Sequence, residues 1–536
     1  MNIFGWSINI QKSYAPTPAA SSKNFQKASV PTGVIISDPW TSFDGEKTAG
    51  ELGRPLNVVA DYKALRMRAY EVDLKADLVR AMTSKFFKWV IGEGLKLQSN
   101  PNKFILEEEG FSSIDLTKLK KQTESRFNLL SYSKNVHQGG MKNLHELAED
   151  AFSDSFLGGD CVVVFRVQKN GYPTIQVIDG QEIVDPMPFS QEYVDAENRG
   201  NQIKHGIEYD KNGSHVAYFI RQKESGKVER VEAFIQIENF KFRAVRIIYG
   251  RKHRINDLRG ISSLTSIIEK IDKLDRFSEA SVAAAEERAN IVYSINHSKD
   301  STGENPNTVR LLKNVPGAGG VTDTETPYEM AKETAKQIAL TTSKQAFNMP
   351  IGSELKVLDS DAEFNYDKFL NSVFDHLCAA LDIPPEVALQ KYSSNYSASR
   401  AAINAWQHII KIYRAKFSEE FYQPYYELFY YCQCLMGKLE GSYDYISVAE
   451  GNDFLIRDAF TNARFMGVNM PHIDPLKEVK AVRELIGTKY SQVPLISLDQ
   501  ATEQLNQGDW EENISKLNSE IEDYDFETDV NTEGNN

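Results

Sequence analysis

Residues 260–290 read GISSLTSIIEKIDKLDRFSEASVAAAEERAN. Apolar residues recur at every third or fourth position of this stretch, which is the spacing of one face of an α-helix. A helix over the whole stretch would be about 45 Å long, more than the width of a small domain. The pattern favours a long strut between two parts of the chain, and an ordinary amphipathic helix of a large core remains the alternative. The apolar positions are Ile261, Leu264, Ile267, Ile268, Ile271, Leu274 and Phe277.

Two further features of this stretch concern its other faces. Lys270, Lys273 and Arg276 lie opposite the apolar stripe and give the helix a basic flank. Residues 278–285 are mostly small, so another backbone can approach the helix closely there. We expect Ala280, Ala284 and Ala285 to be packing positions between subunits.

Length and composition bound the class of protein. A chain of 536 residues exceeds one compact core, so we expect several lobes. The net charge of −14 argues against a protein that coats nucleic acid, although one basic surface is compatible with DNA contact. Four cysteines in so long a chain indicate a reducing compartment, and no apolar run is long enough to cross a bilayer. These features predict a soluble, cytosolic protein without a membrane segment.

The rest of the chain divides into a β-rich part before the long helix and a helical part after it. Asn170-Gly171 and Asn212-Gly213 are turn signals between short apolar runs. Ten aromatic residues within residues 406–431 are typical of helix–helix packing, and Pro424 is expected to kink that helix. Helices are predicted at 61–91, 116–132, 141–157, 369–381, 398–435 and 510–521, and strands at 161–167, 174–178, 206–209, 216–221, 231–237, 242–248 and 291–295.

A cluster of basic residues lies just before the long helix. Such a cluster serves either as a docking surface for an acidic partner or as the charge that protects a solvated edge strand from pairing. Its members are Arg243, Arg246, Arg251, Lys252, His253 and Arg254.

Motifs of known enzyme classes are absent from the sequence. It contains no Cys-x-x-Cys, no HExxH, no G-x-S-x-G, no phosphate loop and no dinucleotide fingerprint. Cys432 and Cys434 are two residues apart, on different sides of a helix, and cannot chelate a metal together. We therefore expect no catalytic residue, cofactor or metal, and an enzyme of unfamiliar type remains a minor alternative.

Seven short motifs in order resemble the lambda-like family of portal proteins of tailed bacteriophages. Leu381 to Ala402, which reads LDIPPEVALQKYSSNYSASRAA, resembles that family's "G-(I/L)-P … N-Y-S-S-x-R" segment, although Asp382 and Ile383 replace the usual small residues. The other motifs are LVRAMTSKFFKWVIGEGLKL (78–97), GDCVVV (159–164) with QVID (176–179), HGIEYD (205–210), RGISSL (259–264), IDPLKE (473–478) and GDWEE (508–512). The signature residues are Pro384, Asn395, Tyr396, Ser397, Arg400, Asp474, Pro475, Lys477 and Glu478.

The resemblance implies an α+β portal fold with a wing, a stem of long helices, a β-rich clip and a helical crown, assembled as a ring. It assigns residues 1–57 to a mobile N-terminal arm, 58–140 to the first part of the wing, 141–159 to stem helix 1, 160–255 to the clip and 256–292 to stem helix 2. It assigns 293–381 to the rest of the wing with a tunnel loop near 351–364, 382–498 to the crown, and 499–536 to an acidic C-terminal helix and a disordered tail.

The resemblance also implies function and partners. It predicts a homo-oligomeric ring of about twelve subunits at one capsid vertex of the virion, assembled in the host cytoplasm, through which double-stranded DNA passes during genome packaging and ejection. The implied partners are the terminase large subunit, a head–tail adaptor protein and the major capsid protein. Lys270, Lys273 and Arg276 are expected to face the channel, and Arg243, Arg246, Arg251, Lys252 and Arg254 to form a docking surface. A contact between neighbouring subunits is the alternative role of the row Lys270/Lys273/Arg276, and a non-portal structural or scaffolding oligomer is the alternative function.

Overall fold

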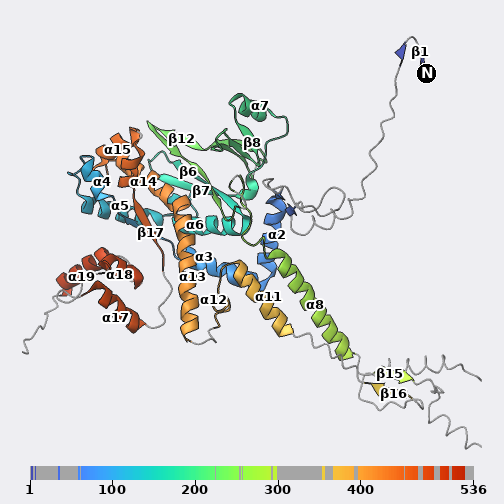
Figure 1. Ribbon diagram of the computed structural model, residues 1–536. Helices are drawn as coiled ribbons and strands as arrows, with labels where there is room; N and C mark the ends of the chain where they lie inside the picture. The colour runs from blue at the N-terminus through green and yellow to red at the C-terminus, as the bar shows by residue number, and fades with distance from the viewer. Residues whose placement is uncertain are drawn as a thin grey trace, which may run out of the picture. The chain divides into compact units, whose positions relative to one another are not determined.

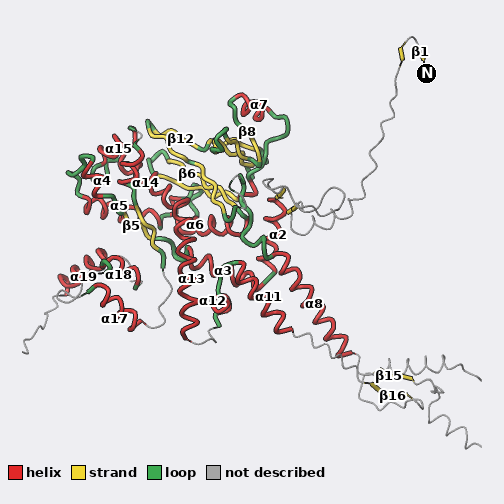
Figure 2. Tube along the Cα trace, viewed as in Figure 1, coloured by secondary structure: helices red, strands yellow, loops and turns green. Residues whose placement is uncertain are grey.

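The computed structural model describes two compact units (Figure 1), which are residues 1–271 with 374–536 (unit 1) and residues 272–373 (unit 2). Within them it describes residues 2–3, 6–7, 34–36, 58–60, 62–223, 225–252, 255, 257–290, 294–297, 353–356, 366–391, 396–451, 453–468, 475–487, 495–505 and 510–524. Helices and strands are mixed within unit 1 (Figure 2), which confirms the predicted mixed class.

The first predicted helix is two helices. α2 spans Tyr62–Lys75 and α3 spans Asp77–Val90, because Ala76 between them has an extended backbone (φ −93°, ψ 105°). α3 buries Val79, Met82 and Phe86, as the three-and-four spacing predicts. The chain then leaves the helix through Gly92, whose φ of +57° favours glycine.

Three capped helices follow. Asn102 caps α4 (Lys103–Glu108), and Asp115 caps α5 (Leu116–Ser131) by accepting hydrogen bonds from two backbone N–H groups. Asn143 and Glu146 form a capping box at α6 (Leu144–Ser153). α6 continues into a π-helical turn, Asp154–Gly158, and six of the ten residues of α6 and four of the five residues of the turn are buried. The helix predicted at 141–157 is therefore present, and its assignment as stem helix 1 stays a prediction.

A three-stranded antiparallel sheet of order β14-β6-β7 lies at the centre of unit 1. Its middle strand β6 (Asp160–Val167) pairs Val163 with Arg246 of β14 (Val245–Tyr249) and with Val177 of β7 (Pro173–Asp179). β6 is buried on both faces from Asp160 to Phe165, which explains its unbroken apolar sequence.

Shorter strands extend the β-rich part. A four-stranded antiparallel sheet has the order β11-β10-β9-β8, and β12 and β13 form a hairpin. The buried residues Ala233 and Ala244 interrupt the runs at 231–237 and 242–248, so each predicted strand is divided into two. The bounds are β8 Gln202–Lys204, β9 Ile207–Tyr209, β10 His215–Arg221, β11 Val228–Glu232, β12 Phe234–Ile237 and β13 Phe240–Arg243, with α7 at Gln191–Asn198.

A long helical segment forms the aromatic core. α13 (Tyr396–Phe417) passes through a π-helical turn, Ser418–Tyr422, into α14 (Gln423–Leu435). Trp406, Tyr425 and Tyr426 are fully buried, which confirms the packing role of the aromatic residues. Pro424 lies in the first turn of α14, where its missing N–H is tolerated, and the π-helical turn precedes it.

The remaining elements of unit 1 complete this core. α12 (Pro385–Leu389) follows Asp382, whose φ of +55° is a conformation that glycine adopts most easily, in agreement with the family's small residue there. β17 (Ala463–Met466) pairs with β5 (Lys96–Ser99), 364 residues apart at Ala463 and Ser99. The other elements are β1 Asn2–Ile3, β2 Trp6–Ser7, β3 Val34–Ile36, β4 Val58–Ala60, α15 Ser442–Glu450, α16 Phe454–Phe460, α17 Pro475–Ile486, α18 Leu498–Gln504 and α19 Trp510–Tyr524.

The long helix is shorter than its sequence pattern predicts. α8 spans Ile268–Asn290, so it is about 35 Å long; before it, Ile261 forms an isolated β-bridge with Arg251 and residues 263–267 form turns. The hydroxyl of Ser262 accepts a hydrogen bond from the N–H of Leu264, and the hydroxyl of Thr265 donates to the carbonyl of Ser262. Serine and threonine side chains offer the backbone these alternatives to a helix, so the apolar pattern was wrong about the start of α8.

Unit 2 contains most of α8, the hairpin of β15 (Ser294–His297) with β16 (Ser353–Lys356), and the start of α11 (Tyr366–Ala380). Phe277 of α8 packs on Phe369 of α11 with ring centroids 4.1 Å apart. β16 lies in the range predicted for the tunnel loop, and most of that range and most of the predicted N-terminal arm lie outside the described residues.

Candidate functional site

A buried ion-pair cluster lies where β6 begins. Asp160 is fully buried, and its carboxylate binds two arginines at once. Arg259 donates from Nε to Oδ2 at 2.7 Å and from Nη2 to Oδ1 at 2.8 Å, and Nη2 of Arg66 donates to Oδ1 at 2.6 Å. Two cations on one carboxylate offset much of the cost of removing these charges from water.

Arg259 is also bound to the backbone around it. Its guanidinium donates to the carbonyls of Gly180, Ile183 and His205 at 2.6, 3.2 and 3.4 Å. The N–H of Gly260 donates to Oδ2 of Asp160 at 2.8 Å, and Gly159 leaves space for this approach. A Cβ on Gly260 would lie 2.0 Å from the carbonyl oxygen of Gly159, so neither glycine has room for a side chain.

A second carboxylate of the cluster has an unusual pKa. Nη1 of Arg66 contacts Asp154 at 3.0 Å and Asp179 at 2.9 Å, and Tyr70 also hydrogen-bonds to Asp154. Burial raises the pKa of Asp154 from 3.8 to about 6, with Arg66 opposing the rise and the neighbouring Asp179 adding to it. The cluster therefore holds one carboxylate that titrates near neutral pH.

Sequence reasoning missed this cluster although both halves of it stand out in the sequence. GDCVVV and RGISSL are separate motifs in the sequence, and the structure joins them through Asp160 and Arg259. The sequence feature that could have revealed the cluster is Asp160, directly before an unbroken apolar strand. A charged side chain in that place is buried, and it needs a partner of opposite charge. Nothing in the sequence pointed to Arg66 as the third member.

The predicted channel residues are exposed and separated by acids. Lys270, Lys273 and Arg276 are exposed, while Ile271 and Leu274 are 3% and 7% exposed, which agrees with the predicted faces of the helix. Half-buried Asp272 and exposed Asp275 lie between the three cations in sequence, and exposed Glu269 and Glu279 flank them, so the exposed surface of α8 is of mixed charge. Channel placement of the row stays a prediction.

The predicted packing alanines are described only in part. Ala280 is exposed, and so is Val282 at 55%, which lies on the opposite side of α8. The side chains of Ala284 and Ala285 lie outside the described residues. Their role between subunits stays a prediction.

The basic cluster divides into an exposed and a half-buried part. Arg251 and Lys252 are exposed, and Nζ of Lys252 lies 4.0 Å from the centroid of the Tyr249 ring. Arg243 lies over Phe234, and Arg246 is turned inward, 3.9 Å from Glu420. Arg243 and Arg246 lie in β13 and β14, whereas Arg251 and Lys252 follow the end of β14. His253 and Arg254 lie outside the described residues.

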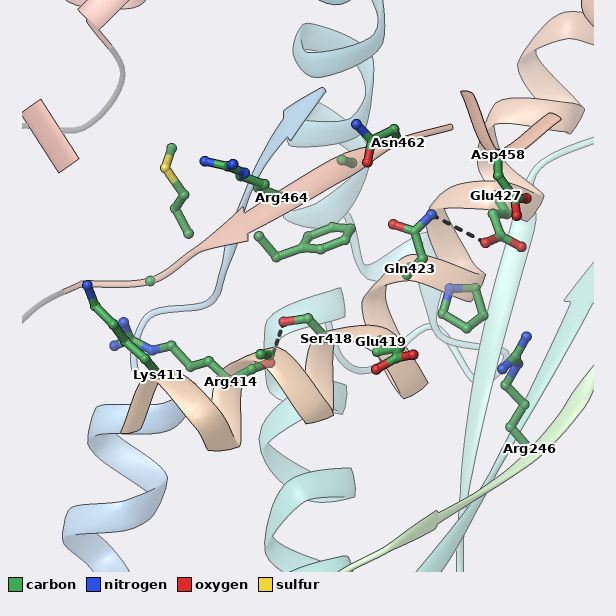
Figure 3. A pocket seen from close by; sticks show the side chains of 16 residues that line it. Arg246, Lys411, Arg414, Ser418, Glu419, Gln423, Glu427, Asp458, Asn462 and Arg464 are labelled. Carbon is green, nitrogen blue, oxygen red and sulfur yellow. Dashed lines mark hydrogen bonds between the residues drawn. The ribbon is translucent and has the colours of Figure 1, made fainter. Parts of the chain in front are cut away.

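A cleft of about 780 Å³ lies between β17 and the helical segment α13–α14 (Figure 3). Lys411 and Arg464 lie at one end of it, and Glu427 and Asp458 at the other. Arg414, also in its wall, donates to the carbonyls of Val90 at 3.1 Å and Trp89 at 2.6 Å. This arginine therefore binds the last carbonyls of α3 and is not available to a ligand.

Two signature motifs contact each other although 78 residues separate them. Nη2 of Arg400 on α13 lies 3.2 Å from Oε1 of Glu478 on α17. Pro384 precedes α12 as its N-cap residue, Pro475 begins α17, and Lys477 is exposed. Tyr396 begins α13, but its side chain and that of Ser397, like Asn395 and Asp474 as a whole, lie outside the described residues.

Neither a metal site nor a membrane span is found in the part of the chain that the structure describes. In these ranges, histidine, cysteine and acidic side chains form no group of three that could hold a metal ion. Within the same ranges, none of the helices combines the length and the apolar character needed to cross a bilayer.

Comparison with known proteins shows the family. A search of curated proteins found no match. Among solved structures, the chain is similar to one described as the neck of a native GTA particle computed with C12 symmetry, with 11% identity, a TM-score of 0.35, and coverage of 75% of this chain and 98% of that chain. The family described as "Phage portal protein, lambda family" matches residues 53–414, which include the cluster and the Leu381 to Ala402 motif. This family is structural and non-enzymatic and implies a component of the virion capsid. The chain therefore belongs to the lambda family of phage portal proteins.

Proposed function

We propose that the chain forms a ring of about twelve subunits at one vertex of a phage capsid and conducts double-stranded DNA during packaging and ejection. The observation that carries this proposal is the family match over residues 53–414. The acidic composition supports it, because a conduit must not hold DNA tightly. Each phosphate neutralised by lysine or arginine adds salt-dependent affinity, and a chain with a net charge of −14 limits that affinity.

The row Lys270/Lys273/Arg276 supplies weak contacts to the passing DNA. Its cations are exposed on α8, and the acids between them keep each contact short-lived. Contacts to phosphate carry no sequence information, so conduction is independent of sequence.

The exposed part of the basic cluster is the docking surface for the terminase large subunit and the head–tail adaptor. Arg251 and Lys252 are exposed at a turn after β14, where they favour acidic partners by electrostatic steering. Arg246 contributes less to docking because it is half-buried beside Glu420. The major capsid protein surrounds the ring at its vertex.

The experiment that tests this function is localisation in assembled heads. Heads formed with the chain and the major capsid protein of the same genome are labelled with gold against an affinity tag on the chain. A portal protein gives one labelled vertex per head. Label spread over the inner shell would instead support the alternative of a scaffolding or other structural oligomer, and would contradict the proposal.

A further inference from the structure

The cleft of about 780 Å³ in Figure 3 runs along the free edge of a β-strand. Its wall includes every residue from Asn462 to Gly467. One face of a strand would contribute alternate residues only, so consecutive residues show that the cleft follows the edge of β17. β17 pairs with β5 on its other edge, and no other described strand pairs with it. An open edge offers unpaired N–H and C=O groups to an extended peptide.

Charges divide the cleft along its length. Lys411 on α13 and Arg464 on β17 lie at one end, and neither forms an ion pair with a described residue. The other end carries Glu427 and Asp458, while Glu419 lies between the ends. Arg246 lies on the acidic side, and its buried Nε has no hydrogen-bond partner among the described residues. The cleft therefore suits a strand that is acidic at one end and uncharged at the other.

Residues 525–532 have that pattern, because their three acids lie within 525–529 and Val530, Asn531 and Thr532 are uncharged before Glu533 follows. Residues 525–530 read DFETDV, in which acidic residues alternate with Phe526, Thr528 and Val530. Alternation with a period of two places all three acids on one face of a strand and the apolar residues on the other. The uncharged residues Asn531 and Thr532 follow. No basic residue occurs after Lys516, so the tail has no internal partner for its acids.

Geometry favours the tail of a second copy. Trp510, at the start of α19, and Arg464 line a common cavity of about 320 Å³, so α19 begins beside β17 of its own chain. The 15 residues of α19 carry its end up to about 22 Å from there. Six extended residues span about 20 Å, and the reversal needed to return consumes part of that length. The tail of a neighbouring copy is not restricted by the distance between the end of α19 and β17 within one chain.

We propose that residues 525–530 of one copy add as a strand to the free edge of β17 in a second copy, with their acids against Lys411 and Arg464. A cross-strand pair of opposite charges on one face stabilises such pairing. The inference rests on the proposed ring for the presence of a neighbour. The binding of the tail to the cleft is measured with a peptide, so its failure can be distinguished from failure of the chain to form a ring.

A peptide of residues 523–533 tests the pairing. The receptor is the full chain with its own tail neutralised (Asp525→Asn, Glu527→Gln, Asp529→Asn), in whatever oligomeric state it adopts, and binding is followed by fluorescence anisotropy. Lys411→Glu and Arg464→Glu should each weaken binding by about tenfold. Lys416→Glu, an exposed lysine on α13 outside the cleft, should leave binding unchanged. Equal effects of all three substitutions, or no binding at all, would overturn the proposal.

Two further measurements address strand addition and the source of the tail. Methylation of the backbone nitrogens of residues 526, 528 and 530 is compared with methylation of 527, 529 and 531, because only one set points toward β17 in an added strand. Loss of binding for one set supports strand addition, and equal binding of both sets contradicts it. An Arg464→Cys chain mixed with a Glu527→Cys chain should form a disulfide between copies on oxidation, since the four native cysteines are buried. Absence of this disulfide while the peptide still binds would contradict the assignment to a second copy.

Discussion

The carboxylate of Asp160 connects two parts of the chain that lie about a hundred residues apart. It binds Arg66, Arg259 and the N–H of Gly260, and Arg259 in turn binds three carbonyls. Buried charges of this kind stabilise a fold only while every partner is present, because loss of one leaves the others unpaired and desolvated. The cluster therefore fixes the path of the chain between β14 and the turns before α8.

Replacing Asp160 with asparagine should lower the free energy of unfolding by about 3–5 kcal/mol, since two buried arginines lose a shared negative charge. Urea denaturation followed by tryptophan fluorescence measures this change. Asp150→Asn is the matched control, because Asp150 pairs with Lys142 at the surface and should matter by less than about 1 kcal/mol. Equal effects of the two substitutions would show that the cluster does not stabilise the fold.

The pKa of Asp154 gives the cluster a pH dependence. The folded chain holds this proton more tightly than the unfolded chain, since the pKa is raised from 3.8 to about 6. Its stabilising contribution is therefore fully present below pH 3.8 and is lost as the pH rises through about 6. The effect of His145 on stability has the opposite pH dependence. Burial lowers the pKa of His145 to about 4, so its stabilising contribution is lost as the pH falls.

Asp154→Asn isolates the first effect, because asparagine stays neutral at every pH. The stability of the native chain relative to this variant should fall by roughly 2.4 kcal/mol between pH ~4 and pH ~7. Urea denaturation across this range measures the difference. A difference that stays constant with pH would mean that Asp154 is ionised throughout.

At the scale of elements, the sequence predicted the presence of helices and strands better than the residues at which they begin and end. The stripe from Ile267 to Leu274 is buried as expected, because its spacing alone defines a helix face. Residues 260–267 carry the same spacing, yet the side chains of Ser262 and Thr265 hydrogen-bond to the backbone and delay the helix. The cluster around Asp160 was not predictable, since it joins residues far apart in sequence and needs the strand pairing of β6 with β14.

The exposed row on α8 leads to a prediction about DNA. Replacing Lys270, Lys273 and Arg276 with glutamine should leave rings intact and flatten the salt dependence of weak binding to linear DNA, by about 0.9 in the logarithmic slope for each phosphate that is no longer neutralised. Filter binding between low and moderate salt measures this. Lys120, Lys121 and Arg126, replaced together on α5, serve as the control. Rings that dissociate without a separate effect on DNA would identify the row as a contact between subunits.

At the scale of the whole molecule, one chain leaves surfaces uncovered that an assembly would use. Ala280 and Val282 are exposed on α8, and no second strand among the described residues pairs with β17 beside the cleft. A closed ring needs two different complementary surfaces on each copy, because its contacts are heterologous. About twelve copies of −14 would give a net charge of about −168, which repels DNA except at local basic rows.

The most direct test of this account is the mass of the purified protein in the absence of DNA. Native mass spectrometry, with negative-stain images of the same sample, should show closed rings of about twelve copies with a central hole, stable over several salt concentrations. Ala284→Trp should reduce assembly and leave the fold of the single chain intact. A stable monomer of 60.6 kDa at micromolar concentration in every salt condition would contradict the account.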